Sequence, residues 1–165
     1  MEGNGASARG FVLWVDADAC PREVRDLIEL SALRRRFRAV FVANSHLRVH
    51  PSEYIEFRMV EHGGDKADDY IVENAVCDDL AITADIPLAA RLVEVDVAVI
   101  DPRGEVMDRG NIEERIATRN LMEELRGAGL IAGGPKEPDA GDRQRFANAL
   151  DRFLTRRLAK GKDGA

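Results

Sequence analysis

Short apolar segments alternate along the first hundred residues with segments in which apolar positions recur every three or four residues. Residues 11–15 are apolar throughout and end at Asp16, a pattern typical of a strand that is buried on both faces. Similar short segments predict further strands at 39–43, 57–60, 80–83 and 97–100. The helical spacing predicts helices at 21–36, at 66–76 and from Pro87. This alternation indicates βαβ units and a mainly parallel sheet.

The last third of the chain has helical patterns only. Residues 111–126 predict a long helix with Asn111 at its cap position, and residues 142–158 predict a second, amphipathic helix. A glycine-rich linker at 127–141 joins them. We therefore expect an α/β fold in which helices flank a mainly parallel central sheet, in a Rossmann-like three-layer arrangement with two C-terminal helices.

The length of 165 residues fits a single domain. We expect this domain to span residues 10–158, with flexible tails at 1–9 and 159–165. The longest apolar run is far shorter than the ~20 residues of a membrane helix, and the first ten residues lack the apolar region of a signal peptide. The two cysteines form no CxxC pair, which suits a reducing compartment. We expect a cytoplasmic protein without membrane contact.

Charge restricts how the chain could bind nucleic acid. It has 24 Lys and Arg residues against 30 Asp and Glu residues, which gives a net charge of -6. This balance argues against binding through bulk positive charge but is compatible with a local basic track. Arg115, Arg119 and Arg126 share one face of the 111–126 helix, which suits either such a track or a solvated face paired with Glu123.

Carboxylates follow three of the predicted strands, and two more lie at the start of the helix at 66–76. They are Asp16, Asp18, Asp85, Asp101, Asp65 and Asp68. The carboxyl ends of parallel strands meet at one edge of a sheet, where ligands of such folds bind. Each carboxylate could instead cap the helix that follows it, with Asp65 and Asp68 forming a cap pair. As a group, however, they repel one another unless a cation lies among them.

The direction of Asp68 favours a metal site over capping alone. The apolar stripe of its helix is set by Ile71, Val72, Ala75 and Val76. At ~100° per residue, Asp68 projects within ~10° of the centre of this stripe, whereas Asp69 lies roughly 90° away. An inward carboxylate loses hydration unless it is protonated, paired or bound to metal. With Asp16 and Asp85 nearby, metal is the simplest explanation, and a site built from carboxylate oxygens suits Mg²⁺ or Mn²⁺ rather than zinc.

Five short motifs occur together in this chain. They are Asp16-Ala17-Asp18-Ala19-Cys20-Pro21, Gly64-Asp65-Lys66-Ala67-Asp68, Thr83-Ala84-Asp85-Ile86-Pro87-Leu88-Ala89, Pro102-Arg103-Gly104 and Gly133-Gly134-Pro135. The set resembles the motifs of the bacterial YaiI/YqxD family of uncharacterised proteins over about residues 12–154, and that family resembles PIN-like nucleases. Two places depart from the commoner family pattern, namely Asp78, where a Gly often stands, and Glu94-Val95-Asp96, where a Lys-Gly-Ala-like turn is usual.

The resemblance implies a PIN-like fold in which acidic residues hold a divalent metal for phosphodiester hydrolysis. The positions that match by motif are Asp16, Asp65, Asp68 and Asp85. One or two Mg²⁺ or Mn²⁺ ions would polarise the scissile phosphate and activate a water. We expect Asp16 and Asp85 to be anchoring ligands and Asp68 to be a ligand or a positioner of the water, with Asp18 and Asp65 as second choices. The expected partner is nucleic acid, with RNA favoured over DNA, and its expected contacts are Asn44, Ser45, Arg103 and Arg119.

Two other functions stay open. A phosphatase that resembles the haloacid dehalogenases would use Asp16 as its nucleophile and Asp18 as its general acid, and it would use Asp69 in place of Asp68. Such enzymes carry a charge-balancing Lys that would fall between the second strand and the Gly-Asp run, where this sequence has none. The third possibility is a non-catalytic module whose acidic site binds a metal or a basic partner.

Overall fold

Six strands form a single sheet at the centre of the protein. The structure is a computed structural model that describes residues 10–134 and 136–163, so the tail expected at residues 1–9 lies outside the described residues. The strands lie in the order β3-β2-β1-β4-β5-β6, and neighbours are parallel except for β5 and β6. Their bounds are Val12–Asp16 (β1), Arg38–Ala43 (β2), Ile55–Met59 (β3), Leu80–Ile82 (β4), Ala98–Ile100 (β5) and Val106–Met107 (β6).

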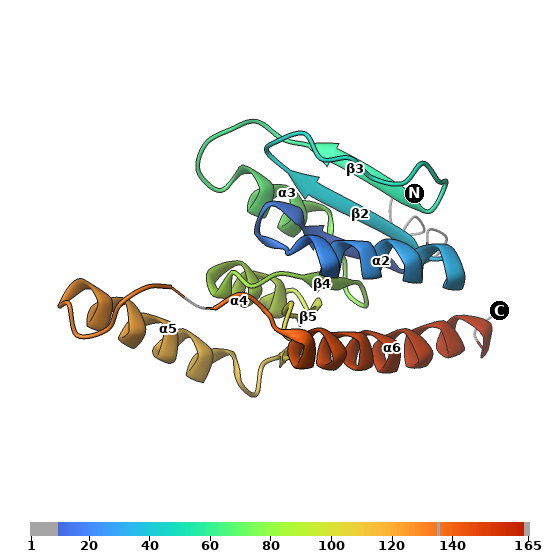
Figure 1. Cartoon of the computed structure of the whole chain (residues 1–165). Helices are drawn as coiled ribbons and strands as arrows, with labels where there is room; N and C mark the ends of the chain where they lie inside the picture. The colour runs from blue at the N-terminus through green and yellow to red at the C-terminus, as the bar shows by residue number, and fades with distance from the viewer. Residues whose placement is uncertain (1–9, 135, 164–165) are drawn as a thin grey trace.

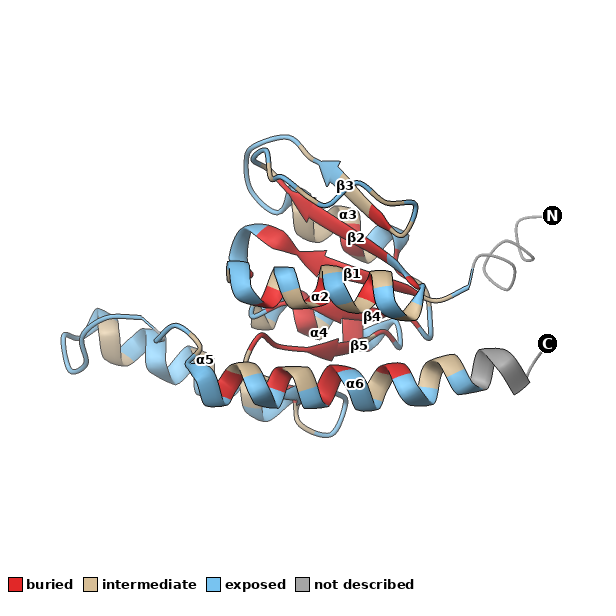
Figure 2. Ribbon diagram, turned by 45° about the vertical axis from the view of Figure 1, so that its right-hand side comes forward, coloured by how far each residue is buried: buried red, intermediate tan, exposed pale blue. Residues whose placement is uncertain are grey.

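Helices flank this sheet on both sides (Figure 1). Their bounds are Arg22–Arg35 (α2), Lys66–Asn74 (α3), Ile86–Glu94 (α4), Ile112–Gly127 (α5) and Ala140–Asp163 (α6), and the 3-10 turn η2 spans Ala17–Ala19. α2 and α6 pack on one face of the sheet, and α3 and α4 pack on the other (Figure 2). α5 packs against α4 and extends away from the sheet (Figure 1). The predicted three-layer α/β fold with two C-terminal helices is confirmed.

The two faces of β1 contribute to separate hydrophobic cores, because successive side chains of a strand point to opposite faces. Leu13 and Val15 belong to the core under α2 and α6, together with Ile28. Val12 and Trp14 belong to the core under α3 and α4. All five residues of β1 are buried, so the prediction of a strand buried on both faces is correct.

Several element ends and one connection differ from the sequence-based expectation. β3 begins at Ile55 rather than at 57, and α6 continues through Asp163 rather than ending near 158. β6 was not predicted, because its two residues are too few to show a periodicity; it pairs antiparallel with β5 across the short turn that joins them. β2 and β3 are parallel but are joined by residues 44–54 without a helix. Among the described residues, this extended connection rather than a helix lies along one side of α2.

A buried carboxylate ties the start of β1 to the turn before β4. Asp79 is 2% exposed and accepts hydrogen bonds from the backbone N–H groups of Val12 (3.1 Å) and Val76 (3.0 Å) and from the indole of Trp14 (3.0 Å). The adjacent Asp78 has φ of 79°, and Asp96 has φ of 62°. Asp78 stands where the YaiI/YqxD pattern often has a glycine, and its left-handed backbone is one that favours glycine. In the second departure the glycine position is Val95, which has φ of -102°, and the left-handed residue is the Asp96 that follows it.

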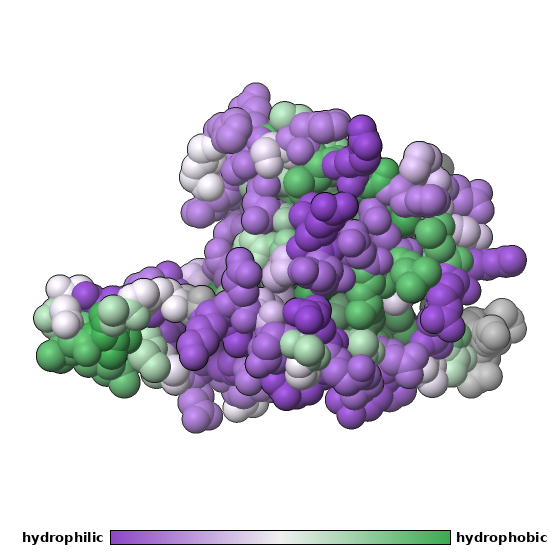
Figure 3. Space-filling model, viewed as in Figure 1, coloured by the Kyte–Doolittle hydropathy of each residue, from purple (hydrophilic) through white to green (hydrophobic). Residues whose placement is uncertain are grey.

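Large apolar side chains are exposed at the far end of α5 and just beyond it (Figure 3). They are Leu121, Met122, Leu130 and Ile131. Among the described residues, no helix combines the length and the apolar character needed to cross a membrane.

Candidate active site

Asp16 lies at the end of the central strand β1 and is 6% exposed. Its Oδ2 accepts a hydrogen bond from the hydroxyl of Thr83 (2.9 Å), which follows the neighbouring strand β4. Burial raises the pKa of Asp16; the Thr83 hydrogen bond opposes this shift, and the charges of Asp85 and Asp18 add to it. The protein thus holds a carboxyl group at the middle of the sheet edge in a setting that disfavours its charge.

Asp68 projects from α3 toward the same place. Its pKa is raised to about 6, first by burial and then by the charges of Asp85, Asp16 and Asp65, with Arg91 opposing the shift. The adjacent Asp69 forms an ion pair with Arg91 instead (2.9 Å between Oδ1 and Nη1). Two consecutive carboxylates therefore have different surroundings, as the helical spacing predicts.

Asp85 caps α4 and also contributes charge to this cluster. Its Oδ1 accepts a hydrogen bond from the backbone N–H of Leu88 (3.1 Å), so the capping interpretation is correct for this residue. The backbone N–H of Asp85 donates to the hydroxyl of Thr83 (3.0 Å). Because the same hydroxyl donates to the carboxylate of Asp16, Thr83 links that carboxylate to the backbone of Asp85. Thr83 was not among the expected site residues; its signal in the sequence is a hydroxyl directly after a buried apolar strand.

Asp18 and Asp65 lie nearby but have other surroundings. Asp18 accepts hydrogen bonds from the backbone N–H of Asn44 (2.7 Å) and from the hydroxyl of Ser45 (3.0 Å), so it fastens the loop after β2 and does not cap α2. Asp65 stands at the cap position of α3, but its side chain makes no capping hydrogen bond. The expected cap pair of Asp65 and Asp68 is therefore not formed.

The acidic cluster, defined here as Asp16, Asp68 and Asp85, has the donor chemistry of a site for a hard divalent cation. Its members come from β1, α3 and the start of α4; the charge of Asp85 raises the pKa of both other members, and the charge of Asp16 raises that of Asp68. A cation would relieve this repulsion. As the side chains lie, no three His, Cys, Asp or Glu residues within the described chain are gathered closely enough to hold a metal ion. Metal binding would therefore require these carboxylates to move together.

A groove of about 690 Å³ runs from the acidic cluster between α4, α5 and the turn after β5. Its lining includes Asp68 and Asp85 at one part and arginines elsewhere, namely Arg91, Arg103, Arg115, Arg119 and Arg126. Several of these arginines are already paired with carboxylates: Arg115 with Glu105, and Arg119 with Glu123 (3.0 Å). The arginines of α5 that were expected to bind phosphate therefore line the groove, but Arg115 and Arg119 are also paired with carboxylates, as the alternative of a solvated, paired face predicts.

Arg103 is placed by a tight turn that presses against α6. The carboxylate of Asp101 accepts a hydrogen bond from the backbone N–H of Arg103 (2.9 Å), so it serves this turn rather than the acidic cluster. Gly104 has φ of 89°, and an added Cβ would lie 2.5 Å from the backbone carbon of Arg145. The guanidinium of Arg103 reaches Asp142 near the start of α6 (3.3 Å). In the Pro102-Arg103-Gly104 motif, the glycine thus allows the turn to lie against α6, and the ion pair with Asp142 holds the Arg103 side chain beside the groove.

The thiol of Cys20 lies close to this edge but is poorly suited to catalysis. It is 6% exposed, and burial raises its pKa to about 12, although Arg25 opposes the shift. The thiolate is the reactive form of cysteine, so this group is unreactive near neutral pH. The chemistry of this edge therefore depends on its carboxylates.

The fold and this edge define an α/β protein with clustered carboxylates at the carboxyl ends of its central strands. The family model described as "Uncharacterized BCR, YaiI/YqxD family" matches residues 14–156. The chain is also 48% identical over 144 residues to a UPF0178 protein of Geobacter metallireducens, covering 87% of this chain and 93% of the relative. A UPF0178 protein of Myxococcus xanthus is 51% identical over 144 residues, covering 87% and 94%. This protein therefore belongs to the YaiI/YqxD family. No solved structure matches it.

Proposed function

We propose that the protein is a metal-dependent phosphodiesterase that cleaves nucleic acid, with RNA favoured over DNA. The observation that carries this proposal is the convergence of Asp16, Asp68 and Asp85 from separate elements. Two of these carboxyl groups have a raised pKa, to which the charges of their neighbours contribute. Perturbed carboxyl groups that meet beside a groove are typical of catalytic and metal sites. The resemblance to PIN-like nucleases supports the same reading.

The acidic cluster would hold one or two Mg²⁺ or Mn²⁺ ions, which supply charge stabilisation and an activated water for phosphodiester hydrolysis. Asp16 and Asp85 would be the anchoring ligands, and their positions are set by the shared hydroxyl of Thr83. Asp68 would donate a further oxygen or orient the attacking water. Asp18 and Asp65 would act from the periphery through their charge.

The groove beside the cluster would receive the substrate strand. Arg103 and Arg119 line it and would bind phosphate groups, because guanidinium groups form paired hydrogen bonds with phosphate oxygens. Asn44 and Ser45 lie on the other side, next to Asp18. Since the chain carries a net charge of -6, we expect binding to be local and strongly weakened by salt.

The phosphatase alternative has less support. It would place Asp69 at the site and give Asp68 no role, but Asp69 pairs with Arg91 while Asp68 interacts with Asp16 and Asp85. A non-catalytic module would share the metal site and differ only in lacking hydrolysis, so an activity assay separates it from the proposal.

The test is cleavage of end-labelled single-stranded RNA in the presence of Mn²⁺, with wild type compared with Asp85→Asn. Asparagine can still cap α4, so the fold should persist while the charge is removed. Asp151→Asn, an exposed carboxylate on α6, is the matched control. We expect wild type and the control to cleave and Asp85→Asn to lose most activity. Equal cleavage by all three proteins would refute the assignment, and cleavage by none would exclude RNase activity on this substrate.

A further inference from the structure

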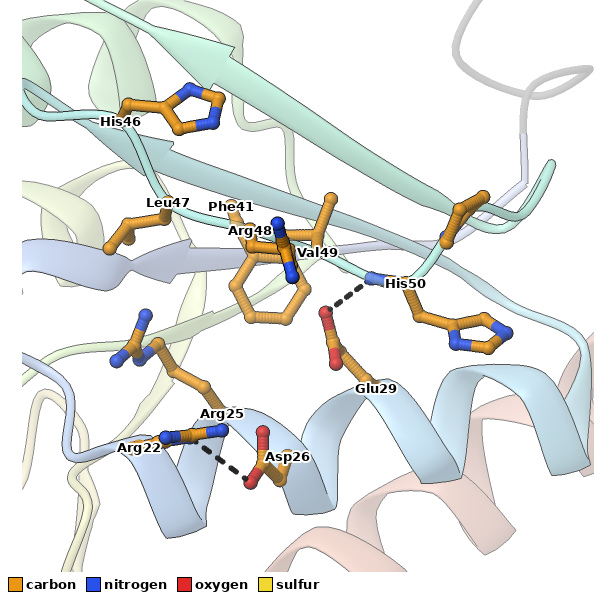
Figure 4. A pocket seen from close by; sticks show the side chains of 11 residues that line it. Arg22, Arg25, Asp26, Glu29, Phe41, His46, Leu47, Arg48, Val49 and His50 are labelled. Atoms are coloured by element: carbon orange, nitrogen blue, oxygen red, sulfur yellow. Dashed lines mark hydrogen bonds and ion pairs between the residues drawn. The ribbon is translucent and has the colours of Figure 1, made fainter.

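A second groove lies on the opposite side of the sheet from α4 and α5, between α2 and the loop that follows β2 (Figure 4). It has a volume of about 540 Å³. We call it the α2 groove and define it by Arg22, Arg25, Asp26, Glu29, Phe41 and residues 46–51. It exists because residues 44–54 join two parallel strands without a helix, so that a single extended segment covers this side of α2.

The side chains of two arginines of the α2 groove form no hydrogen bond or ion pair with the described residues. The Nε of Arg25 is shielded from solvent and donates to no acceptor in the described part of the chain. Among the same residues, Arg48 forms neither a hydrogen bond nor an ion pair. Arg35 and Arg38, by contrast, are paired with Asp151 and Glu56. Both side chains line the α2 groove, so their positive charges, which no carboxylate of the described residues pairs with, face a space that an anionic ligand could occupy.

The carboxylates of the α2 groove only partly neutralise these arginines. Asp26 lies 3.9 Å from Arg22. Glu29 accepts a hydrogen bond from the backbone N–H of His50 (3.0 Å), which holds its charge toward the far end of the groove. Figure 4 shows Arg25 projecting from α2 toward the loop that carries His46 and Leu47. The end of the groove that contains Arg22 and Arg25 is thus the more positive one.

This positive end adjoins the sheet edge that carries the acidic cluster. Asp18 bonds to the hydroxyl of Ser45, and the next residue, His46, lines the α2 groove. α2 begins at Arg22, shortly after Asp18 in the chain. Arginines therefore flank the carboxylates on both sides, from α5 on one side and from α2 on the other.

We infer that the α2 groove binds a phosphate group of the same nucleic-acid strand whose neighbouring phosphodiester lies at the acidic cluster. Arg25 and Arg48 would bind the phosphate oxygens, and the partly apolar floor formed by Phe41, Leu47 and Val49 would contact sugar or base. This inference rests on the proposed function, because it names how the substrate of that site is held. It predicts a substrate that spans several nucleotides rather than a mononucleotide.

The experiment measures binding without cleavage. Fluorescence anisotropy follows a labelled ten-nucleotide single-stranded RNA in EDTA, at several salt concentrations, with wild type, Arg25→Gln and Arg48→Gln. Arg34→Gln is the matched control, since Arg34 lies on α2 but outside the α2 groove. We expect each groove variant to bind about tenfold more weakly and to reduce the salt slope by about 0.7, the value for one phosphate contact with a single strand. The control should remain within about twofold of wild type.

Two results would overturn the inference. One is equal binding by the groove variants and the control. The other is unchanged RNA binding in variants that have lost binding of inorganic phosphate, which would make the α2 groove a small-anion site. Arg48 is exposed on a loop, so its variant should fold even if Arg25→Gln does not. In wild type, the ¹⁵N-resolved Nε–H signal of Arg25 should also shift on addition of RNA, and an unmoved signal would contradict the contact. Because no metal is present, loss of binding here is independent of whether the acidic cluster hydrolyses RNA.

Discussion

Removing the charge of Asp68 should stabilise the metal-free protein at neutral and alkaline pH. Its pKa is raised from 3.8 to about 6, mainly by burial and by the charges of Asp85 and Asp16. A carboxyl group with a raised folded-state pKa favours the folded state while it is protonated, and this contribution is lost as pH rises through the folded pKa. Ionised Asp68 therefore opposes folding above about pH 6. Asp68→Asn lacks this penalty.

The size of this effect follows from the pKa shift and the exposure. For a fully buried carboxyl group, a rise in pKa from 3.8 to about 6 would correspond to about 3 kcal/mol. Asp68 is only partly buried, and solvent screening reduces the expected gain to about 1 kcal/mol. In a domain of this size, that is a rise of about 2–4 °C in the unfolding temperature.

The assay is thermal unfolding in EDTA at pH 8 and at pH 4 for wild type, Asp68→Asn and Asp69→Asn. We expect Asp68→Asn to be the more stable protein at pH 8 and to lose its advantage at pH 4, where wild-type Asp68 is protonated. Asp69→Asn removes an exposed ion pair with Arg91 and should give no gain. Added Mn²⁺ should stabilise wild type more than Asp68→Asn. A pH-independent loss of stability in Asp68→Asn would show that ionised Asp68 does not oppose folding.

Three further substitutions test the fold that positions the site. Asp79→Ala leaves three N–H groups without their acceptor and should lower the free energy of unfolding by about 3 kcal/mol or more in urea titrations; a loss below about 1 kcal/mol would contradict the described network. Gly104→Ala places a Cβ against the backbone of α6 and should cost about 2 kcal/mol or more, whereas wild-type stability would show that this turn is not pressed on α6. Asp78→Gly relieves a left-handed backbone but removes the ion pair with the half-buried Arg157, so it should add no more than about 0.5 kcal/mol; a clear loss in the same titration would show that the ion pair outweighs the backbone relief.

The elements that could be predicted are those with a local signal. The apolar run of β1 identified a strand buried on both faces, and helical spacing distinguished Asp68 from Asp69. The placement of strand ends at one edge followed from parallel topology, which brings Asp16 and Asp85 together.

The features that escaped prediction depend on contacts between distant parts of the chain. The hydrogen bond from Thr83 to Asp16 forms because β1 and β4 are neighbours in the sheet. No local sequence pattern predicts this pairing. The α2 groove forms because residues 44–54 connect β2 to β3 without a helix. The sequence of these loop residues does not show that they lie against α2. Asp18 has the position of a helix cap in the sequence, yet it bonds to the loop after β2, because η2 turns it toward that loop.

Calorimetric titration of Mn²⁺ into wild type, Asp68→Asn and Asp69→Asn at pH 8 tests whether Asp16, Asp68 and Asp85 form the proposed site for a divalent cation. The two variants remove adjacent carboxylates from the same helix. We predict that Asp68→Asn binds Mn²⁺ at least tenfold more weakly than wild type, since it loses a charged ligand, and that Asp69→Asn binds it normally. Normal Mn²⁺ binding by Asp68→Asn together with weakened binding by Asp69→Asn would exclude Asp68 as a metal ligand and favour the phosphatase arrangement.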